Sequence, residues 1–434
     1  MRRSRADVVV IGAGPAGLAA ASAAREVGAR RVVVLERDER AGGILPQCVH
    51  TGFGLRRYGR DLAGPEYAGL ELARALKSGA EVRLDCCALR LEPGGGVRRP
   101  NAVVAVSPAG LEEIRAPSVV LAMGCRERPA GSLGIPGSRV AGVMTAGTAQ
   151  RLINIAGIMP GRKAVVLGSG DVGLIVARRL ALEGATVAGV FEAVAWAGGL
   201  PRNVSQCLCD FGIPLFLGHT VAEVHGRARL EGVTVCEVGR DMRPVRSTAR
   251  EIACDTLLLS VGLIPENELS REAGVPISPA TGGPLVDECG ASLTPGVYAC
   301  GNAVYVHDFV DDVTTEGEIA GAAAARFALG ESGDRRRDGC KMFFREGRNV
   351  RFVSPAFVRL GRGRAWPSLA LRSRRPAANV TPVFRWEGGQ CSGPDLEFVN
   401  PGETIRLNLP VEVRGLIESD TRRDVTVEVS LESQ

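Results

Sequence analysis

Patterns for membrane insertion and for paired-thiol chemistry are missing from this sequence. No run approaches the ~18 consecutive apolar residues of a transmembrane helix, and the apolar stretch Val8–Ile11 ends at a glycine. Twelve cysteines are present, but no two are spaced as C-x-x-C and they form no metal-ligand pattern. We therefore expect reduced thiols, no metal site, no transmembrane segment and a cytoplasmic location.

An excess of charge of one sign is missing as well. Lysine and arginine total 53 against 48 aspartates and glutamates, which leaves a net charge of +5. Nucleic-acid-binding domains concentrate basic residues on one face or one helix, so we expect no nucleic-acid partner. The basic runs Arg335–Arg337 and Arg372–Arg375 predict solvated surface, and Met1–Arg5 predicts a short exposed arm.

Glycine, by contrast, is abundant. The 434 residues include 56 glycines, and 45% of the chain is hydrophobic. This composition is typical of a globular α/β protein. At roughly 150 residues per domain, the length predicts about three domains.

A glycine-rich turn follows the first apolar run. Residues 7–11 predict a buried strand, and an alanine-rich helix is expected to run to about Val27. The turn between them has the pattern G-x-G-x-x-G, which permits a tight turn, close approach of the backbone to a pyrophosphate, and close helix–strand packing. The helix N-terminus then faces the phosphates. The turn residues are Gly12, Ala13, Gly14, Pro15, Ala16 and Gly17.

An acidic residue ends the second predicted strand. Residues 31–35 form that strand, and Glu36 follows it. In this position a carboxylate accepts hydrogen bonds from the ribose of an adenine dinucleotide. The first segment of the chain therefore predicts a dinucleotide site.

The same pattern returns downstream. A strand is predicted over Lys163–Leu167, and a second one over residues 186–191 ends at Glu192. An offset of 156 residues separates Gly12 from Gly168, and the same offset separates Glu36 from Glu192. Two copies in register are far more specific than one G-x-G-x-x-G. The second turn consists of Gly168, Ser169, Gly170, Asp171, Val172 and Gly173.

Glu192 also predicts which nicotinamide cofactor binds. A carboxylate pairs with ribose hydroxyls and repels a 2′-phosphate, and residues 193–195 supply no arginine to bind that phosphate. The second site therefore favours NAD(H) over NADP(H).

With two such sites in this order, the chain resembles the pyridine nucleotide-disulfide oxidoreductase class. In that class FAD occupies the first site and a nicotinamide nucleotide the second. Three further segments carry the resemblance: Gly42–Gly43, the run 119–124 with its Ala-Met-Gly turn, and the strand and turn over 257–265. A fourth, residues 294–302, ends in Gly-Asn where most of the class has Gly-Asp. Asparagine keeps a carbonyl acceptor, so we expect cofactor binding to survive.

The resemblance implies a set of cofactor-binding residues beyond the two turns. On the nicotinamide side it adds Gly262. On the FAD side it adds Arg37, Gly43, Ile44, Ala122, Gly124, Gly301 and Asn302.

A narrower resemblance concerns four runs, namely residues 42–54, 124–128, 202–208 and 306–311. They are similar to a bacterial subfamily that is often encoded beside a glycerol 3-phosphate dehydrogenase-like flavoprotein and a small cysteine-motif protein. Similar subunits occur in multi-subunit amino-acid dehydrogenases and opine oxidases. The resemblance implies a redox subunit that acts on a small-molecule substrate together with such a small protein and such a dehydrogenase-type flavoprotein. Any membrane association would be peripheral and would go through these partners.

The redox disulfide of the class is missing. Cys48 has no partner at the C-x-x-x-x-C spacing, so an internal dithiol relay is not expected. Cys48 and His50 are the candidate catalytic side chains, the thiol through a flavin contact or a sulfenic acid and the imidazole through proton transfer. His307 is a further candidate for proton relay. Packed structural roles for all three remain open.

Three functions follow. The first is an FAD-dependent oxidoreductase that transfers hydride between NAD(H) and bound flavin. The alternatives are an NADH oxidase or peroxidase that uses Cys48, and a protein of the complex that binds a nucleotide structurally.

The expected fold is α/β, with two Rossmann-like domains and a small C-terminal β-rich domain. An FAD-binding domain comprises residues 1–125 and 263–332, and an NAD(H)-binding domain, residues 126–262, is inserted in it. The β-rich domain covers 333–434, where strands are predicted over 350–360, 380–386, 396–399, 404–409 and 425–431.

Overall fold

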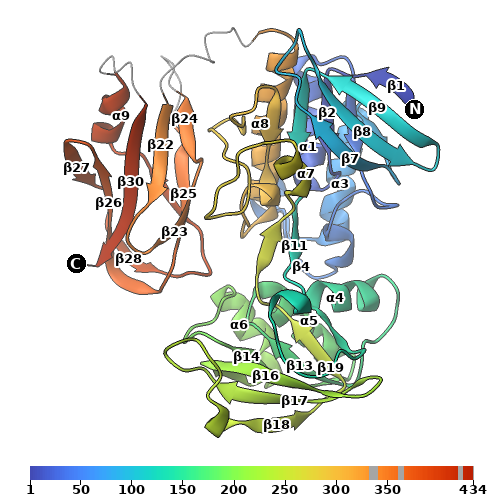
Figure 1. Ribbon diagram of the computed structural model, residues 1–434, viewed down its shortest axis with the longest axis vertical. Coiled ribbons are helices and arrows are strands. Elements are labelled where there is room, and N and C mark those ends of the chain that lie inside the picture. Colours follow the sequence, from blue (N-terminus) through green and yellow to red (C-terminus); the bar gives the residue numbers. More distant parts are fainter. Residues whose placement is uncertain (332–340, 360–365, 419–423, 434) are drawn as a thin grey trace. The chain divides into compact units, whose positions relative to one another are not determined.

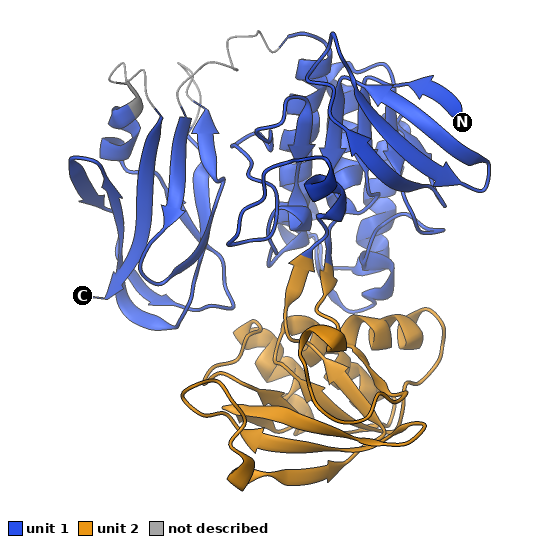
Figure 2. Cartoon of the chain, in the orientation of Figure 1, with its two compact units in different colours: residues 1–125, 265–434 blue, residues 126–264 orange. Residues whose placement is uncertain are grey.

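The computed structural model describes residues 1–331, 341–359, 366–418 and 424–433. The chain divides into two compact units, one of residues 1–125 with 265–434 and one of residues 126–264 (Figure 2). The second unit is inserted in the sequence of the first. The chain passes between them in β11 (Cys125–Glu127) and β20 (Leu263–Pro265), which pair with each other.

A parallel five-stranded sheet forms the centre of the first unit. Its order is β21 (Val297–Ala299), β10 (Ser118–Leu121), β2 (Val8–Ile11), β3 (Val32–Leu35) and β6 (Glu81–Arg83). Strands β2, β3 and β10 are buried throughout, because both faces of the sheet are covered. Val8 and Val10 pack with the alanines of two helices, whereas Val9 and Ile11 pack against a second sheet.

The two helices on this face are α1 (Pro15–Val27) and α8 (Val310–Ala328), which lie side by side in Figure 1. Their backbones touch, since a Cβ on Gly321 would lie 2.0 Å from Ala20 O. Helix α8 begins at Val310. Asp311 and Asp312 occupy its first turn, where negative charge offsets the helix dipole.

The second sheet of this unit has the order β1 (Arg2–Arg5), β9 (Gly110–Ala116), β8 (Asn101–Ser107) and β7 (Cys87–Glu92). The prediction of a short arm at Met1–Arg5 was wrong, because Arg2–Arg5 forms a strand parallel to β9. Arg3 lies 4.0 Å from Glu113 across this pairing. In this register Arg2 and Arg3 lie opposite Glu112 and Glu113, and such opposite-charge pairs favour the pairing of the two strands.

The second unit repeats the parallel arrangement. Its sheet has the order β12 (Val143–Thr145), β19 (Thr256–Leu259), β13 (Lys163–Leu167), β14 (Thr186–Glu192) and β15 (Leu215–Leu217). Helices α4 (Ala146–Asn154), α5 (Asp171–Leu182) and α6 (Pro201–Cys207) belong to it. So does an antiparallel sheet of β16 (His219–Gly226), β17 (Leu230–Glu237) and β18 (Arg250–Ala253). In both units the strand before the glycine-rich turn is the middle one.

The C-terminal part is built from two small sheets around its own apolar core. One contains β24 (Phe357–Arg359), β22 (Lys341–Glu346), β30 (Val425–Ser433), β26 (Ala377–Trp386), β27 (Gly389–Ser392) and β28 (Leu396–Val399). The other contains β23 (Val350–Ser354), β25 (Ser368–Ser373) and β29 (Ile405–Asn408), and helix α9 spans Val411–Glu418.

Two predictions for this region need correction. Residues 350–359 are not one strand, because Pro355 interrupts them and β23 and β24 join different sheets. A proline cannot donate to a strand ladder. Arg372 is not solvated surface, since its side chain is only 13% exposed and pairs with Asp308. The run Arg335–Arg337 lies outside the described residues.

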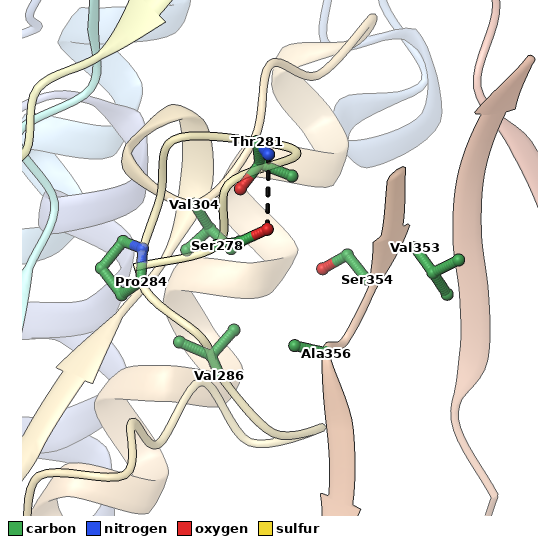
Figure 3. Close-up of a pocket in the computed structure, with 8 residues that line it drawn as sticks. All are labelled: Ser278, Thr281, Pro284, Val286, Val304, Val353, Ser354 and Ala356. Atoms are coloured by element: carbon green, nitrogen blue, oxygen red, sulfur yellow. Dashed lines mark hydrogen bonds between the residues drawn. The ribbon is translucent and has the colours of Figure 1, made fainter. Parts of the chain in front are cut away.

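A small pocket lies where residues 278–286 meet the turn after β23 (Figure 3). Its described lining contains no charged side chain, and we assign it no chemistry. No helix in the described part of the chain is long and apolar enough to cross a membrane.

Candidate functional site

The first glycine-rich turn joins β2 to α1. Gly12 has φ +103°, and a Cβ there would lie 2.4 Å from Ala122 O. A Cβ on Gly17 would lie 1.9 Å from Gly12 O. Only glycine fits either position, so the sequence pattern reflects close backbone contact.

The N-terminus of α1 is open in front of this turn. Among the described side chains none caps the helix at Gly14, and a Cβ on Gly14 would meet only Gly43 Cα, at 3.8 Å. The free backbone amides of a helix's first turn bind anions such as phosphate. The residues present therefore fit a pyrophosphate at this position.

Glu36 is held against the same turn. Its Oε2 accepts a hydrogen bond of 2.8 Å from the Ala13 amide, and its Oε1 accepts one of 3.0 Å from Asp38. The side chain is buried at the end of β3. Each carboxylate oxygen keeps a lone pair for a further donor.

Gly42 and Gly43 pass close to the turn. The Gly42 amide donates to Ala13 O at 2.8 Å, and Gly43, with φ +60°, lies so near Gly14 that a Cβ would be 3.1 Å from its Cα. Ile44 is exposed. The exposed guanidinium of Arg37 lies 3.7 Å from Glu266.

The second turn reproduces this geometry. The Ser169 amide donates to Glu192 Oε2 at 2.9 Å, and the Ser169 hydroxyl donates to the same oxygen at 2.6 Å. Gly168 has φ +90°, and a Cβ there would lie 2.2 Å from Ser260 O. Ser169 and Glu192 stand 156 residues after Ala13 and Glu36. The internal repeat therefore extends to individual hydrogen bonds.

The repeat also includes a second Gly-Gly pair, which sequence reasoning missed. The Gly198 amide donates to the hydroxyl of Ser169 at 2.8 Å, whereas the Gly42 amide donates to the backbone carbonyl of the equivalent residue, Ala13. The signal was present, because Ala197-Gly198-Gly199 repeats the residues at 41–43 at the same offset.

Asp171 anchors the segment that follows this pair. Its Oδ1 accepts hydrogen bonds from the Leu200 amide at 2.8 Å and from Asn203 Nδ2 at 2.6 Å. Asn203 belongs to one of the four subfamily runs. Val172 follows at the start of α5, where it packs partly buried against the core of the unit.

The remaining predicted glycines lie where the chain leaves and re-enters the first unit. The Ala122 amide donates to Ile11 O at 2.9 Å, and Gly124 O accepts from Glu266 at 2.9 Å. Gly262 has φ +104°, and its carbonyl accepts from Arg128 at 3.1 Å. Each of these hydrogen bonds lies within one unit, next to a crossing.

Asn302 lies at the centre of a polar cluster. Its Oδ1 accepts from the His307 amide at 3.0 Å and lies 3.1 Å from His307 Nδ1, and its Nδ2 donates to Cys125 Sγ at 3.6 Å. Gly301 before it has φ +65°. Sequence reasoning did not select Cys125, since only the fold brings it to Asn302.

The two candidate catalytic side chains, Cys48 and His50, contact backbone carbonyls of their own segment of the chain. Cys48 is buried, and its thiol donates to Ile44 O at 3.4 Å. His50 Nδ1 lies 2.9 Å from Thr51 O, and its ring centroid is 5.1 Å from that of Phe53. None of the eleven cysteines in the described ranges forms a disulfide. In the same ranges no cluster of His, Cys, Asp or Glu is arranged to hold a metal ion.

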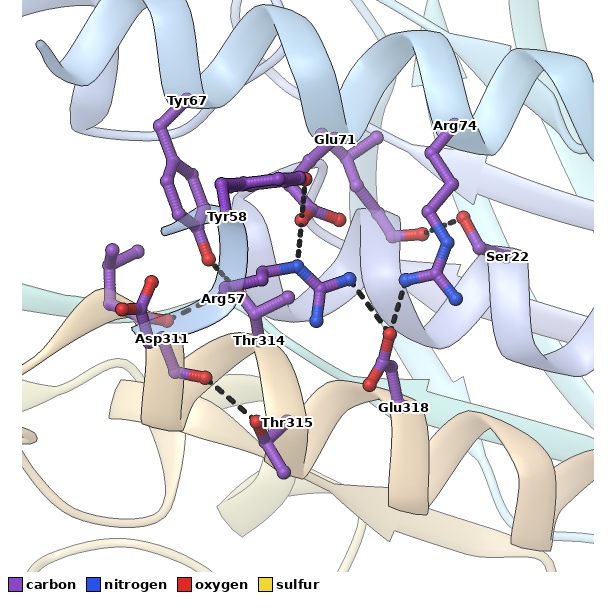
Figure 4. Close-up of polar contacts among 12 residues, drawn as sticks. Ser22, Arg57, Tyr58, Tyr67, Glu71, Arg74, Asp311, Thr314, Thr315 and Glu318 are labelled. Atoms are coloured by element: carbon purple, nitrogen blue, oxygen red, sulfur yellow. Dashed lines mark hydrogen bonds and ion pairs between the residues drawn. The ribbon is translucent and has the colours of Figure 1, made fainter. Parts of the chain in front are cut away.

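A charged network fixes the segment after His50 (Figure 4). This segment contains β4 (Thr51–Phe53), α2 (Leu55–Tyr58) and β5 (Leu62–Ala63). Arg57 pairs with Glu71 of α3 (Gly64–Lys77) at 2.6 Å and with Glu318 of α8 at 2.8 Å. Burial acts to raise the pKa of Glu318, but hydrogen bonds and charge from Arg57 and Arg74 outweigh it and lower the pKa.

The sequence matches the family described as pyridine nucleotide-disulphide oxidoreductase over residues 6–326. That range covers well over half of the chain and contains both glycine-rich turns. The chain belongs to the pyridine nucleotide-disulphide oxidoreductase family. The predicted family is thereby confirmed.

Two relatives among the curated proteins are subunits by name. Hydrogen cyanide synthase subunit HcnB of Pseudomonas aeruginosa is 32% identical over 68% of this chain. An opine oxidase subunit of Agrobacterium tumefaciens is 29% identical over 75% of this chain. The alignments span 65% of the length of each relative. The predicted similarity to opine oxidase subunits is confirmed.

The fold of this family member is also found in solved structures. The crystal structure of T. acidophilum thioredoxin reductase matches with a TM-score of 0.60 and 22% identity, over 76% of this chain and 99% of that chain. At this identity the likeness concerns the fold alone. It confirms the predicted α/β class.

Proposed function

We propose that this protein is an FAD-dependent oxidoreductase that transfers hydride between NAD(H) and bound flavin without an internal redox disulfide. The observation that carries the proposal is the pair of equivalent hydrogen bonds from Ala13 to Glu36 and from Ser169 to Glu192. Two turns built alike, each at a helix N-terminus, suit two dinucleotides.

The first turn is assigned to FAD. The amides of the first turn of α1 would hold the pyrophosphate, and the free lone pairs of Glu36 would accept from the adenosine ribose. Gly43 and the Gly301–Asn302 turn would border the cofactor. When bound, FAD supplies the hydride-accepting ring, and the protein's residues bind and orient it.

The second turn is assigned to NAD(H). Glu192 is ready to accept from a ribose, and its neighbours Ala193, Val194 and Ala195 carry no positive charge for a 2′-phosphate. Asp171 is already engaged with Leu200 and Asn203, so it shapes the site by holding residues 198–203.

These assignments define the domains we propose. Residues 1–125 and 263–332 form the FAD-binding domain, residues 126–262 the NAD(H)-binding domain, and residues 333–434 a β-rich domain. The β-rich domain is tied to the FAD-binding domain by Asp308, which pairs with Arg372 and accepts from the Thr404 amide at 2.6 Å.

We further propose that the protein works within a larger, multi-subunit dehydrogenase. Support comes from the relatives, which are named as subunits. The proposed partners are a small cysteine-motif protein and a dehydrogenase-type flavoprotein, and the proposed substrate is a small molecule.

An anaerobic titration tests the central proposal. The purified chain, loaded with FAD, is titrated with NADH and separately with NADPH. Reduction of the flavin is followed as the loss of its absorbance near 450 nm, and about one equivalent of NADH per flavin is required. We expect NADH to bleach the flavin and NADPH to do so at far higher concentration. Failure to bind FAD, or bound flavin that NADH leaves oxidised, would overturn the proposal.

A further inference from the structure

His307 is a buried imidazole with a fixed proton. Its side chain is 2% exposed. Ring atom Nδ1 lies 3.1 Å from Asn302 Oδ1 and 3.0 Å from Tyr305 O. Both neighbours are oxygen acceptors, so Nδ1 carries a hydrogen.

The other ring nitrogen faces a carboxylate. His307 Nε2 lies 2.9 Å from Glu316 Oε1 on α8. The two atoms lie within ion-pair distance but not in hydrogen-bonding geometry. With the ring protonated, the pair consists of an imidazolium and a carboxylate and has no net charge.

Glu316 receives further donors. The Tyr305 hydroxyl donates to Oε1 at 2.9 Å, and the Gly301 amide donates to Oε2 at 3.3 Å. Burial acts to raise the pKa of Glu316, but the charge of His307 and the hydrogen bonds from Tyr305 and Gly301 outweigh it and lower the pKa. The carboxylate is therefore the stable form.

This carboxylate stands beside the proposed phosphate position. Gly301, which donates to it, lies so close to α1 that a Cβ would be 2.9 Å from the Cβ of Ala16. Ala16 belongs to the first turn of α1. A carboxylate left uncompensated here would repel a pyrophosphate.

The other charges around the pair are themselves paired. Burial acts to lower the pKa of Arg406 in β29, but its interactions with Tyr305, Asp312 and Glu316 outweigh this and raise the pKa. The Arg406 guanidinium lies 3.1 Å from the Asp312 carboxylate. Asp308 pairs with Arg372. Burial raises the pKa of the Cys300 thiol, and the Cys125 thiol accepts from Asn302. In the described part of the chain, His307 is the basic side chain within ion-pair distance of Glu316.

We propose that His307 neutralises Glu316 beside the Gly301 amide, so that this turn accepts the pyrophosphate-bearing FAD, and that Asn302 positions the His307 ring. The inference rests on the proposed FAD site. It also gives a reason for Asn302 in place of aspartate. The amide accepts from His307 and donates to Cys125, whereas aspartate would add a second negative charge.

The test uses the full chain as apoprotein, with FAD as the titrant. His307→Gln is expected to weaken FAD binding roughly 10-fold or more at neutral pH, because Glu316 loses its counter-charge. Glu316→Gln alone is expected to bind FAD at least as tightly as the wild type. The double variant His307→Gln/Glu316→Gln is expected to regain most of the lost affinity. Glu183→Gln, which removes a partly exposed carboxylate that pairs with Arg179 in α5, serves as the control and should leave the affinity unchanged.

A second readout needs no cofactor. Nitrogen-15 NMR of the four histidines reports the protonation of each ring nitrogen in the apoprotein. We expect His307 to carry hydrogens on both nitrogens and to lose the one on Nε2 in Glu316→Gln.

The outcomes separate the two proposals. Wild-type apoprotein that does not bind FAD overturns the proposed function, and this inference with it. Wild-type binding that is matched by His307→Gln, or a double variant as weak as His307→Gln, overturns the inference alone. A His307 ring with one proton in the wild type overturns it as well.

Discussion

The amide of Ala13 donates a 2.8 Å hydrogen bond to the carboxylate of Glu36. This bond joins the glycine-rich turn to the end of the neighbouring strand and so fixes the carboxylate beside the N-terminus of α1. The equivalent bond from Ser169 to Glu192 is 2.9 Å long. The same hydrogen bond thus positions a carboxylate in each turn to accept from an adenosine ribose.

Charge removal at each carboxylate should affect one cofactor only. We expect Glu36→Gln to weaken FAD binding and Glu192→Gln to weaken NADH binding, each by about 10-fold, because a hydrogen bond to a charged group contributes ~1.5–3 kcal/mol. Dissociation constants for both cofactors should be measured on both variants. Glu183→Gln, whose side chain is 38% exposed and pairs only with Arg179 among the contacts described, is the control. A Glu192→Gln protein that loses FAD as readily as NADH would contradict separate sites.

Two glycines in helices should respond to alanine with opposite signs. Gly17→Ala places a Cβ 1.9 Å from Gly12 O. We therefore expect the free energy of unfolding to fall by about 3 kcal/mol and FAD binding to be lost. Gly69→Ala lies in α3 with nothing within 4 Å of the new Cβ, so we expect a gain of about 0.5–1 kcal/mol. Thermal unfolding of both variants checks the pair, and equal effects would refute the packing argument.

Acid should remove the contribution of Glu318 to the stability of the fold. Its pKa is lowered from the ordinary value of 4.5 by Arg57 and Arg74 against the opposing effect of burial. A carboxyl whose folded-state pKa is depressed stabilises the fold above its unfolded value, and that stabilisation is lost as the pH falls through the folded value. The difference in thermal midpoint between the wild type and Glu318→Gln should therefore be largest near neutral pH and shrink below about pH 4.5. Glu39→Gln, at a side chain 65% exposed, should show no such trend.

Cys48→Ala separates the two redox mechanisms. The Cys48 thiol already donates to Ile44 O, so we expect the variant to keep its NADH-dependent flavin reduction and any oxygen turnover. Stopped-flow reduction and oxygen consumption measure the two. A variant that reduces its flavin normally but loses oxidase or peroxidase turnover would favour the cysteine-based alternative.

Asp308 should matter for stability through Arg372. Their side chains are 9% and 13% exposed, and removal of one partner of a buried pair leaves an uncompensated charge. We expect Asp308→Asn to lower the free energy of unfolding by about 2–4 kcal/mol in the wild type. In an Arg372→Met background the same substitution should lower it by less than ~1 kcal/mol. Proteolysis of the β-rich domain and thermal unfolding would reveal the difference. An undiminished cost in the second background would mean that Thr404, rather than Arg372, is the important partner.

Much of this protein follows from local sequence. The strands and glycine-rich turns at 8–17 and 163–173 follow from apolar runs that meet glycines, because tight turns and helix–strand contact leave no room for a Cβ. The offset of 156 residues between Glu36 and Glu192 was visible without a structure. Family membership followed from the same patterns.

Other features depended on residues far apart in the sequence. The strand at Arg2–Arg5 exists because β9 offers a partner edge, and no apolar pattern within the segment signals it. Arg372 looked like surface because its neighbours are arginines, but the fold brings it to Asp308. The contacts of His307 with Asn302 and Glu316 also require the turn after β21 to meet helix α8. The sequence determined the two glycine-rich turns because each is formed by residues close together in the chain. The charge balance beside the first turn was decided only by tertiary structure, because the fold sets the distances between charged groups that are far apart in the sequence.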